Sequence, residues 1–163
     1  MSKQAFLGYI ATERQRLNTT IQEKEQEVEN GSADADSVEL LLECRTRVET
    51  LDRCDYCCQH LEMRASSQWL RTEGGRLLRK NIMGLIRRTS RNPSDAAAEE
   101  QLRHFTIQRN QVRSCYRALM RGTMSNADMD SSFNSVDETK NPQEDERSRP
   151  RPDDNKTPCG FCN

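Results

Sequence analysis

The densest group of chemically capable side chains in this sequence is the segment CDYCCQH, with Cys54, Cys57, Cys58 and His60. Thiolate and imidazole are the ligands that zinc prefers in proteins, and a Cys-x-x-Cys pair often begins a zinc site. On a helix, however, Cys54 and Cys58 fall on the same stripe as Cys44, whereas Cys57 and His60 project to other sides. The spacing therefore favours small, buried, apolar roles for the cysteines of the stripe.

A second Cys-x-x-Cys pair, Cys159 and Cys162, lies in the segment TPCGFCN. A redox pair normally stands at a helix start beside a strand, where the local field lowers the thiol pKa, and no βαβ pattern surrounds this one. A four-thiolate zinc site that joins the pair to Cys54 and Cys57 is a further candidate, because each doubling of a loop adds only about 0.6 kcal/mol to its closure. Zinc at these four cysteines is the one cofactor that the sequence suggests.

Basic residues are concentrated in the middle of the chain. Residues 63–122 carry a net charge of +9, between residues 1–62 at −6 and residues 123–163 at −4. Cations on an accessible face can bind the phosphates of RNA or DNA. The alternative is that they meet the acidic first helix, either within the chain or in a second copy. The candidate nucleic-acid-binding residues are Arg76, Arg79, Lys80, Arg87, Arg88 and Arg91.

The segment RRTS places Ser90 shortly after two arginines. Basic residues upstream of a serine are what acidic kinase clefts select, and a phosphate here would remove about 1.5–2 units of positive charge. Ser90 is therefore a candidate phosphorylation site.

The sequence contains no constellation typical of an enzyme. Its two histidines, His60 and His104, lie in no recognisable arrangement with a nucleophile or a carboxylate pair, and there is no glycine-rich phosphate loop. We therefore expect a protein that is not an enzyme.

Long amphipathic helices are expected to position these residues. Apolar side chains recur at three- and four-residue spacing, which predicts an all-α fold with helices over residues 4–29, 37–71, 76–90 and 93–121. The first two helices are expected to form an elongated antiparallel hairpin, or to pair with another copy in a coiled-coil-like arrangement. A two-helix layer buries little surface, so self-association is expected in either arrangement. The stripe residues expected to carry assembly are Leu7, Ile10, Leu17, Ile21, Leu41, Val48, Leu51, Phe105 and Val112.

Local signals predict where these helices begin and stop. Asp36 and Glu39 have the spacing of a capping box, with Asp36 as the N-cap of the second helix. The pair Gly74-Gly75 is expected to interrupt the helical pattern, and Asn92-Pro93 is expected to begin the last helix.

The composition fits a thinly cored helical region, residues 1–122, followed by a polar tail. Only 33% of the 163 residues are apolar and 31% are charged, with a mean hydropathy of −0.98. Residues 123–163 show no periodicity, which predicts a disordered acidic tail that ends in the second Cys-x-x-Cys pair. No run approaches the roughly 18 apolar residues of a membrane span, and the seven cysteines do not suggest a secreted disulfide framework. We therefore expect no membrane partner and a cytoplasmic or nuclear location.

Two stretches resemble the Gag-like leader region of BEL/Pao-type LTR retrotransposons. PCGFCN is similar to the opening half of a zinc knuckle, and YIATERQRLNTTIQEKEQEV is similar to the charged helix that precedes further helices in those leaders. The resemblance implies a helical region, a polar linker and a nucleic-acid-binding end that holds zinc. The His and the last Cys of a knuckle do not follow Cys162 in this sequence, and two thiols alone cannot complete a tetrahedral site.

Together these features predict a non-catalytic, self-associating helical module for protein–protein interaction or scaffolding. Its partner would be a second copy or another protein, bound through the helical stripes. The alternative is a Gag-like protein that binds RNA or DNA through residues 71–91, with or without zinc at the last two cysteines.

Overall fold

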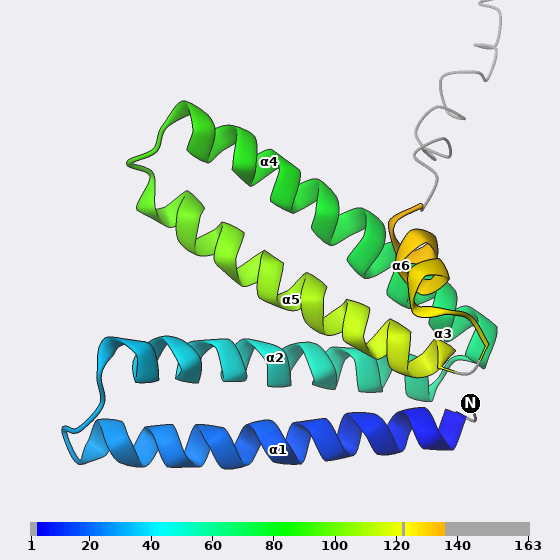
Figure 1. Cartoon of the computed structure of the whole chain (residues 1–163), viewed down its shortest axis with the longest axis horizontal. Coiled ribbons are helices and arrows are strands. Elements are labelled where there is room, and N and C mark those ends of the chain that lie inside the picture. Colours follow the sequence, from blue (N-terminus) through cyan, green and yellow to red (C-terminus); the bar gives the residue numbers. More distant parts are fainter. Residues whose placement is uncertain (1–2, 122, 136–163) are drawn as a thin grey trace, which may run out of the picture.

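The computed structural model describes residues 3–121 and 123–135, and these residues are almost entirely helical (Figure 1). In chain order the elements are α1 (Lys3–Glu29), α2 (Ala35–Gln59), α3 (Met63–Leu70), the π-helical segment η1 (Arg71–Leu77), α4 (Leu78–Arg91), α5 (Ala96–Met120) and α6 (Asn126–Asn134). β-structure within these ranges is limited to an isolated bridge between Arg121 and Met124. The predicted all-α fold is confirmed. No helix in the described ranges is long and apolar enough to cross a bilayer.

α1 and α2 form the antiparallel hairpin that the sequence predicts (Figure 1). Their connection turns at Gly31, whose φ of +68° is a conformation that glycine adopts without strain. Arg14 of α1 joins the two helices through ion pairs with Asp52 and Asp55 of α2, at 2.7 and 2.9 Å.

The start of α2 differs from the predicted capping box. Asp34, not Asp36, is the N-cap, and its carboxylate accepts a hydrogen bond from the Ser37 N–H at 2.8 Å. A side-chain acceptor at this position satisfies one of the free N–H groups of the first turn. The helix therefore begins at Ala35, two residues before its predicted start.

The single helix predicted over residues 37–71 is wrong in extent, because α2 ends at Gln59 and α3 begins at Met63. Lys3 Nζ, at the start of α1, donates hydrogen bonds to the carbonyls of Gln59 and Leu61 at 2.6 and 2.8 Å. A cation on the last carbonyls of a helix stabilises that end. Lys3 is 56 residues away from Gln59 in the sequence, so no local signal predicts this contact.

The Gly74-Gly75 pair does not interrupt the helical chain, contrary to the prediction. Both glycines are buried inside η1, which continues from α3 into α4 without a loop. A Cβ at Gly74 would lie 2.8 Å from Val112 Cγ1 and would overlap the Phe133 ring. Glycine at this position therefore lets α5 and α6 approach the helix closely.

α4 and α5 form a second hairpin, and α5 does not begin at Asn92-Pro93 as predicted. Asn92 closes α4, and α5 begins at Ala96 after Asp95, whose carboxylate accepts from the Ala98 N–H at 3.0 Å. Asp95 also pairs with Arg88 Nε at 2.7 Å, so it connects the end of α4 to the start of α5.

The predicted tail is wrong at its beginning, because residues 126–134 form α6. Ser125 caps this helix by accepting from the Asp128 N–H at 3.2 Å. Met129 and Phe133, four residues apart, are both buried. The rest of the predicted tail, with Cys159 and Cys162, lies outside the described residues.

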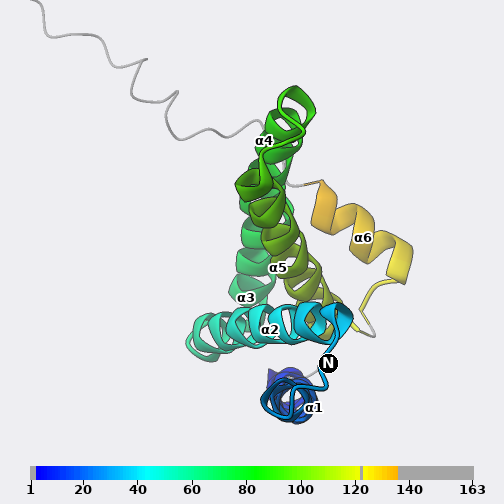
Figure 2. The ribbon, with the colours of Figure 1, turned by 90° about the vertical axis from the view of Figure 1, so that its left-hand side faces the viewer.

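The two hairpins meet at one end and diverge toward the other (Figure 1). Figure 2 shows α4 and α5 rising from α2 on the side opposite α1. The fully buried large side chains that form the core include Tyr116, Phe6, Phe133, Leu51 and Leu119. They come from α1, α2, α5 and α6, so the core lies where the hairpins meet and the diverging ends remain open.

Candidate functional site

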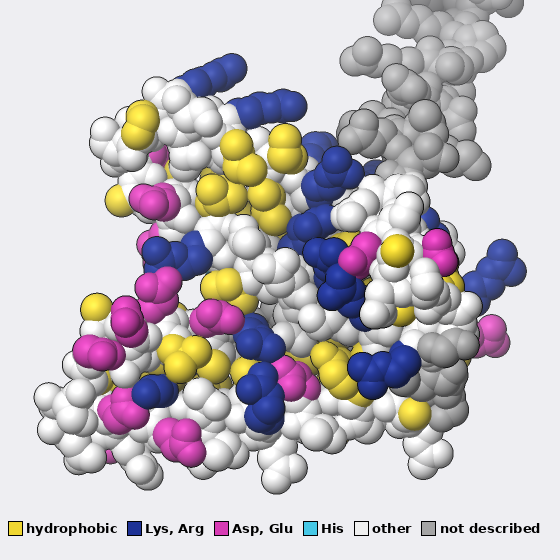
Figure 3. Space-filling model, in the orientation of Figure 1, with side chains coloured by type: hydrophobic (Ala, Val, Ile, Leu, Met, Phe, Trp, Pro, Cys, Tyr) yellow, Lys and Arg dark blue, Asp and Glu magenta, His cyan; other side chains and the backbone are white. Residues whose placement is uncertain are grey.

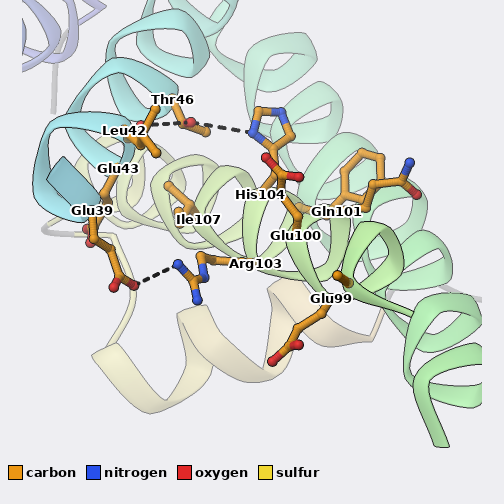
Figure 4. Close-up of a pocket in the computed structure, with 12 residues that line it drawn as sticks. Glu39, Leu42, Glu43, Thr46, Glu99, Glu100, Gln101, Arg103, His104 and Ile107 are labelled. Carbon is orange, nitrogen blue, oxygen red and sulfur yellow. Dashed lines mark hydrogen bonds and ion pairs between the residues drawn. The ribbon is translucent and has the colours of Figure 1, made fainter. Parts of the chain in front are cut away.

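An open cleft of about 720 Å³ lies between α2 and α5, where the two hairpins diverge. Its walls carry four glutamates, Glu39 and Glu43 from α2 and Glu99 and Glu100 from α5 (Figure 4). We call this region the acidic cleft. Leu42 projects from α2 into the same region with 56% of its surface exposed. The cleft therefore combines an exposed apolar side chain with surrounding carboxylates.

Two polar contacts join the walls of the acidic cleft (Figure 4). Arg103 of α5 pairs with Glu39 of α2 at 3.0 Å. His104 Nδ1 lies 3.4 Å from Thr46 Oγ1, and the Thr46 hydroxyl donates to the Leu42 carbonyl at 3.0 Å. Because Thr46 donates elsewhere, the imidazole donates to it from Nδ1. The Glu39–Arg103 ion pair and the His104–Thr46 hydrogen bond both connect α2 to α5.

The exposed face of α4 carries the second candidate surface. Lys80, Arg87 and Arg91 of α4 follow one another at helical spacing on the side opposite the buried Leu78 and Leu85, and the half-buried Arg76 at the end of η1 continues this line. We call these four cations the basic stripe. Among residues 3–121 and 123–135, no carboxylate forms an ion pair with any of the four.

The other two predicted nucleic-acid-binding residues are engaged within the chain. Arg88 pairs with Asp95, and Arg79 Nη1 donates to the Asn134 carbonyl at 3.1 Å. Four of the six predicted cations, those of the basic stripe, therefore form no ion pair within the described structure.

The acidic first helix does not neutralise the basic stripe within one chain, so that alternative is wrong. Glu25 pairs with Arg45 of α2 at 2.7 Å, and Glu27 pairs with Lys24 of its own helix at 2.7 Å. α4 packs instead against α5 and η1. The alternative that remains from the sequence is pairing across two copies.

The residues predicted to carry assembly belong to the core of a single chain. Five of them are buried, namely Ile10, Leu17, Leu41, Leu51 and Val112. The others are partly buried against that core, namely Leu7, Ile21, Val48 and Phe105. These stripes therefore do not need a second chain to cover them, contrary to the expectation from the sequence, because α1, α2 and α5 cover one another.

The cysteines of CDYCCQH lie on different sides of α2. Cys54 is fully buried, and its contact with the Cys115 thiol, together with burial, raises its pKa. Burial raises the pKa of Cys58 to about 11, whereas Cys57 lies on another side of α2 and is half-buried. No group of three or more metal-ligating side chains occurs among the residues that the structure describes. The apolar interpretation fits Cys54 and Cys58.

Ser90 is exposed in the last turn of α4, close to Arg87 and Arg91 of the basic stripe. Its hydroxyl is therefore on the surface, and the prediction of phosphorylation stays a prediction.

Three features of these surfaces were not predicted from the sequence. Leu42 belongs to no stripe, so its exposure in the cleft follows only from the divergence of the hairpins. His104 has no local partner pattern. The segment that forms α6 carries two weak signals, the Ser125-x-x-Asp128 capping spacing and the four-residue interval between Met129 and Phe133.

No protein-family model, curated protein or solved structure matches this chain. The resemblance to Gag-like leaders therefore stays a prediction, and the proposals below rest on the geometry of the chain itself.

Proposed function

We propose that this chain is a non-catalytic interaction module that self-associates, with the basic stripe of one copy against the acidic cleft of another. One observation carries the proposal. Four cations along one face have no ion-pair partner in the described chain. Of the four glutamates around the cleft, Glu39 pairs with Arg103 and Glu43 pairs with Arg47 at 3.6 Å, whereas Glu99 and Glu100 form no ion pair within the described residues. Opposite charges on two separate faces favour contact between molecules and set its orientation.

Exposed apolar side chains accompany both charged surfaces. Met83 and Ile86 of α4 are 44% and 40% exposed, and Leu42 in the cleft is 56% exposed. Met83 lies between Lys80 and Arg87 on α4. Contact between these apolar groups would remove them from water, which supplies affinity that charge pairing alone seldom gives.

The overall charge also favours association. The net charge is only −1, although the middle of the chain is strongly basic and its flanks are acidic. Little long-range repulsion therefore opposes contact between copies, and the segregated charges attract.

Sedimentation velocity at about 50 and about 500 mM salt, measured on the full chain, tests this proposal. We expect a dimer or larger species that weakens at high salt. The variant Lys80→Gln, Arg87→Gln, Arg91→Gln should lose association by at least about tenfold, because three of the pairing charges are gone. The control Arg16→Gln, Arg45→Gln, Arg64→Gln removes the same charge from α1, α2 and α3 and should associate like the parent. A parent that sediments as a monomer at both salt concentrations contradicts the proposal.

Binding of RNA or DNA is the second candidate, and the length of the basic stripe favours it. Fifteen residues separate Arg76 from Arg91, about 22 Å along a helix, which is long enough to contact several phosphates. Fluorescence anisotropy of labelled single-stranded RNA, with the same two triple variants, tests it. Salt-sensitive binding that only the α4 variant loses would support this function, and no binding at low salt would exclude it.

A further inference from the structure

α6 covers a second concentration of arginines, distinct from the basic stripe. In Figure 3, which has the orientation of Figure 1, dark-blue side chains gather to the left of the region that α6 occupies. The arginines that hydrogen-bond to α6 come from η1, α4 and α5, namely Arg71, Arg79, Arg109, Arg113 and Arg117. We call these five arginines, together with Gly74 and Tyr116, which contact Phe133 of α6, the α6 site.

Asp130 is the acidic anchor of α6. Its carboxylate accepts from Arg113 Nε at 3.0 Å and from Arg117 Nε at 2.9 Å, and both guanidiniums also contact its second oxygen. These two arginines hold the pKa of Asp130 well below its usual range. A carboxylate between two forked guanidiniums is a directional, charge-assisted contact.

Phe133 is the apolar anchor, one turn further along. Its ring is fully buried, with Tyr116 at a centroid distance of 5.6 Å and the Arg109 guanidinium 5.5 Å above its face. Gly74 lies beneath the ring, and a Cβ there would overlap it. The α6 site thus contains a pocket shaped for an aromatic side chain, which a phosphate backbone would leave empty.

The last turn of α6 provides the remaining contacts. The carbonyls of Ser132 and Asn134 accept from Arg71 Nε at 3.0 Å and from Arg79 Nη1 at 3.1 Å. Arg109 Nη2 donates to Asn134 Oδ1 at 2.6 Å. The carbonyl end of a helix carries partial negative charge, so it suits this basic surface.

One carboxylate faces five arginines, so α6 leaves the site with excess positive charge. Burial, and then the nearby charges of Arg113 and Arg79, lower the pKa of Arg109, because both disfavour its charged form. α6 has nine residues and buries only Met129 and Phe133. A helix this short is not stable alone, and a segment with few buried contacts opens more easily than the core.

We infer that the α6 site is a binding surface for an acidic amphipathic helix of a partner protein, and that α6 is its occupant in the resting chain. The partner helix would carry a carboxylate and an aromatic residue three positions later, as Asp130 and Phe133 do. It would displace α6 and add further carboxylates for Arg71, Arg79 and Arg109. This inference goes beyond the proposed self-association, which uses the basic stripe and the acidic cleft between α2 and α5.

The test measures how a fluorescent peptide of residues 123–135, used as the probe, binds to the full chain. The variant Asp130→Asn, Phe133→Ser loses both anchors of α6 without altering the surface beneath it. We expect this variant to bind the peptide at least about tenfold more tightly than the parent, whose own α6 competes. Asp128→Asn is the matched control. It makes the same charge change in the same helix, keeps an acceptor for the Ser125 hydroxyl, and should behave like the parent.

Hydrogen exchange separates the possible failures of this test. In the variant, residues 126–134 should exchange rapidly while α1 to α5 stay protected, and in the parent an excess of peptide should speed exchange of the chain's own α6. A released α6 and protected α1–α5 without peptide binding would overturn the inference. So would equal binding of a peptide with Asp130→Asn, or binding of single-stranded RNA but not peptide. None of these outcomes depends on whether the protein self-associates.

Discussion

At the scale of single residues, one missing side chain decides how three helices meet. Gly74 is buried in η1, and Val112 of α5 and Phe133 of α6 occupy the space that a Cβ at this position would need. The sequence marks this glycine only as a helix breaker, because a propensity describes the local chain. Its role becomes visible once residues far away in the sequence are placed beside it.

Gly74→Ala should therefore destabilise the fold. Its Cβ would lie 2.8 Å from Val112 Cγ1, and we expect the free energy of unfolding to fall by about 1–3 kcal/mol, as for other overpacked cores. Urea unfolding followed by circular dichroism measures the change. The control is Gly84→Ala in α4, where a Cβ meets nothing within 4 Å and helix propensity should raise the free energy of unfolding by about 0.5–1 kcal/mol. Equal behaviour of the two variants would contradict the packing described for η1.

Helical spacing predicts part of the environment of the cysteines. The helical stripe correctly separates Cys54 and Cys58, which are buried, from Cys57, which is not fully covered. Spacing alone could not reveal that Cys54 contacts the Cys115 thiol of α5, because that contact depends on how the two hairpins cross.

At the scale of elements, periodicity predicts the presence of helices better than their limits. α1 (Lys3–Glu29) nearly coincides with the predicted helix over residues 4–29. Its apolar stripe is continuous, and the loop before α2 marks its end. The carbonyls at the break after Gln59 are capped by Lys3, which is 56 residues away in the sequence, and α6 is held by arginines from three other elements. Tertiary contacts of this kind leave only weak local signals.

The two aspartates at the start of α2 give an element-scale prediction. Asp34→Ala removes the acceptor for the Ser37 N–H and should lower the Tm by about 2–4 °C, whereas Asp36→Ala should shift it less. The Ser37 N–H lowers the pKa of Asp34 in the folded protein. This stabilisation is therefore fully present above the unfolded-state pKa of about 3.9 and is lost as the pH falls through the lower folded-state pKa.

Differential scanning calorimetry at pH 7 and at about pH 2.5 checks both parts of this prediction. The difference between Asp34→Ala and the parent should shrink at the lower pH. A larger effect of Asp36→Ala at pH 7 would instead restore the capping box predicted from the sequence.

At the scale of the whole molecule, the protein keeps its opposite charges apart. The core joins the hairpins at one end, so the acidic cleft and the basic stripe remain on separate surfaces. The sequence predicts the acidic and basic segments from charge counts alone. It could not predict that the stripe stays unpaired, because that follows from α4 packing against α5 rather than α1.

A charge exchange between two variants tests whether the basic stripe of one copy meets the acidic cleft of another. One variant carries Arg87→Glu and Arg91→Glu in α4, and a second variant carries Glu43→Lys and Glu100→Lys in the cleft. Each variant alone should sediment as a monomer, since like charges then face each other. An equimolar mixture should form a heterodimer, because both α4-to-cleft contacts regain opposite charges. A mixture that stays monomeric, or either variant associating alone like the parent, would contradict the account.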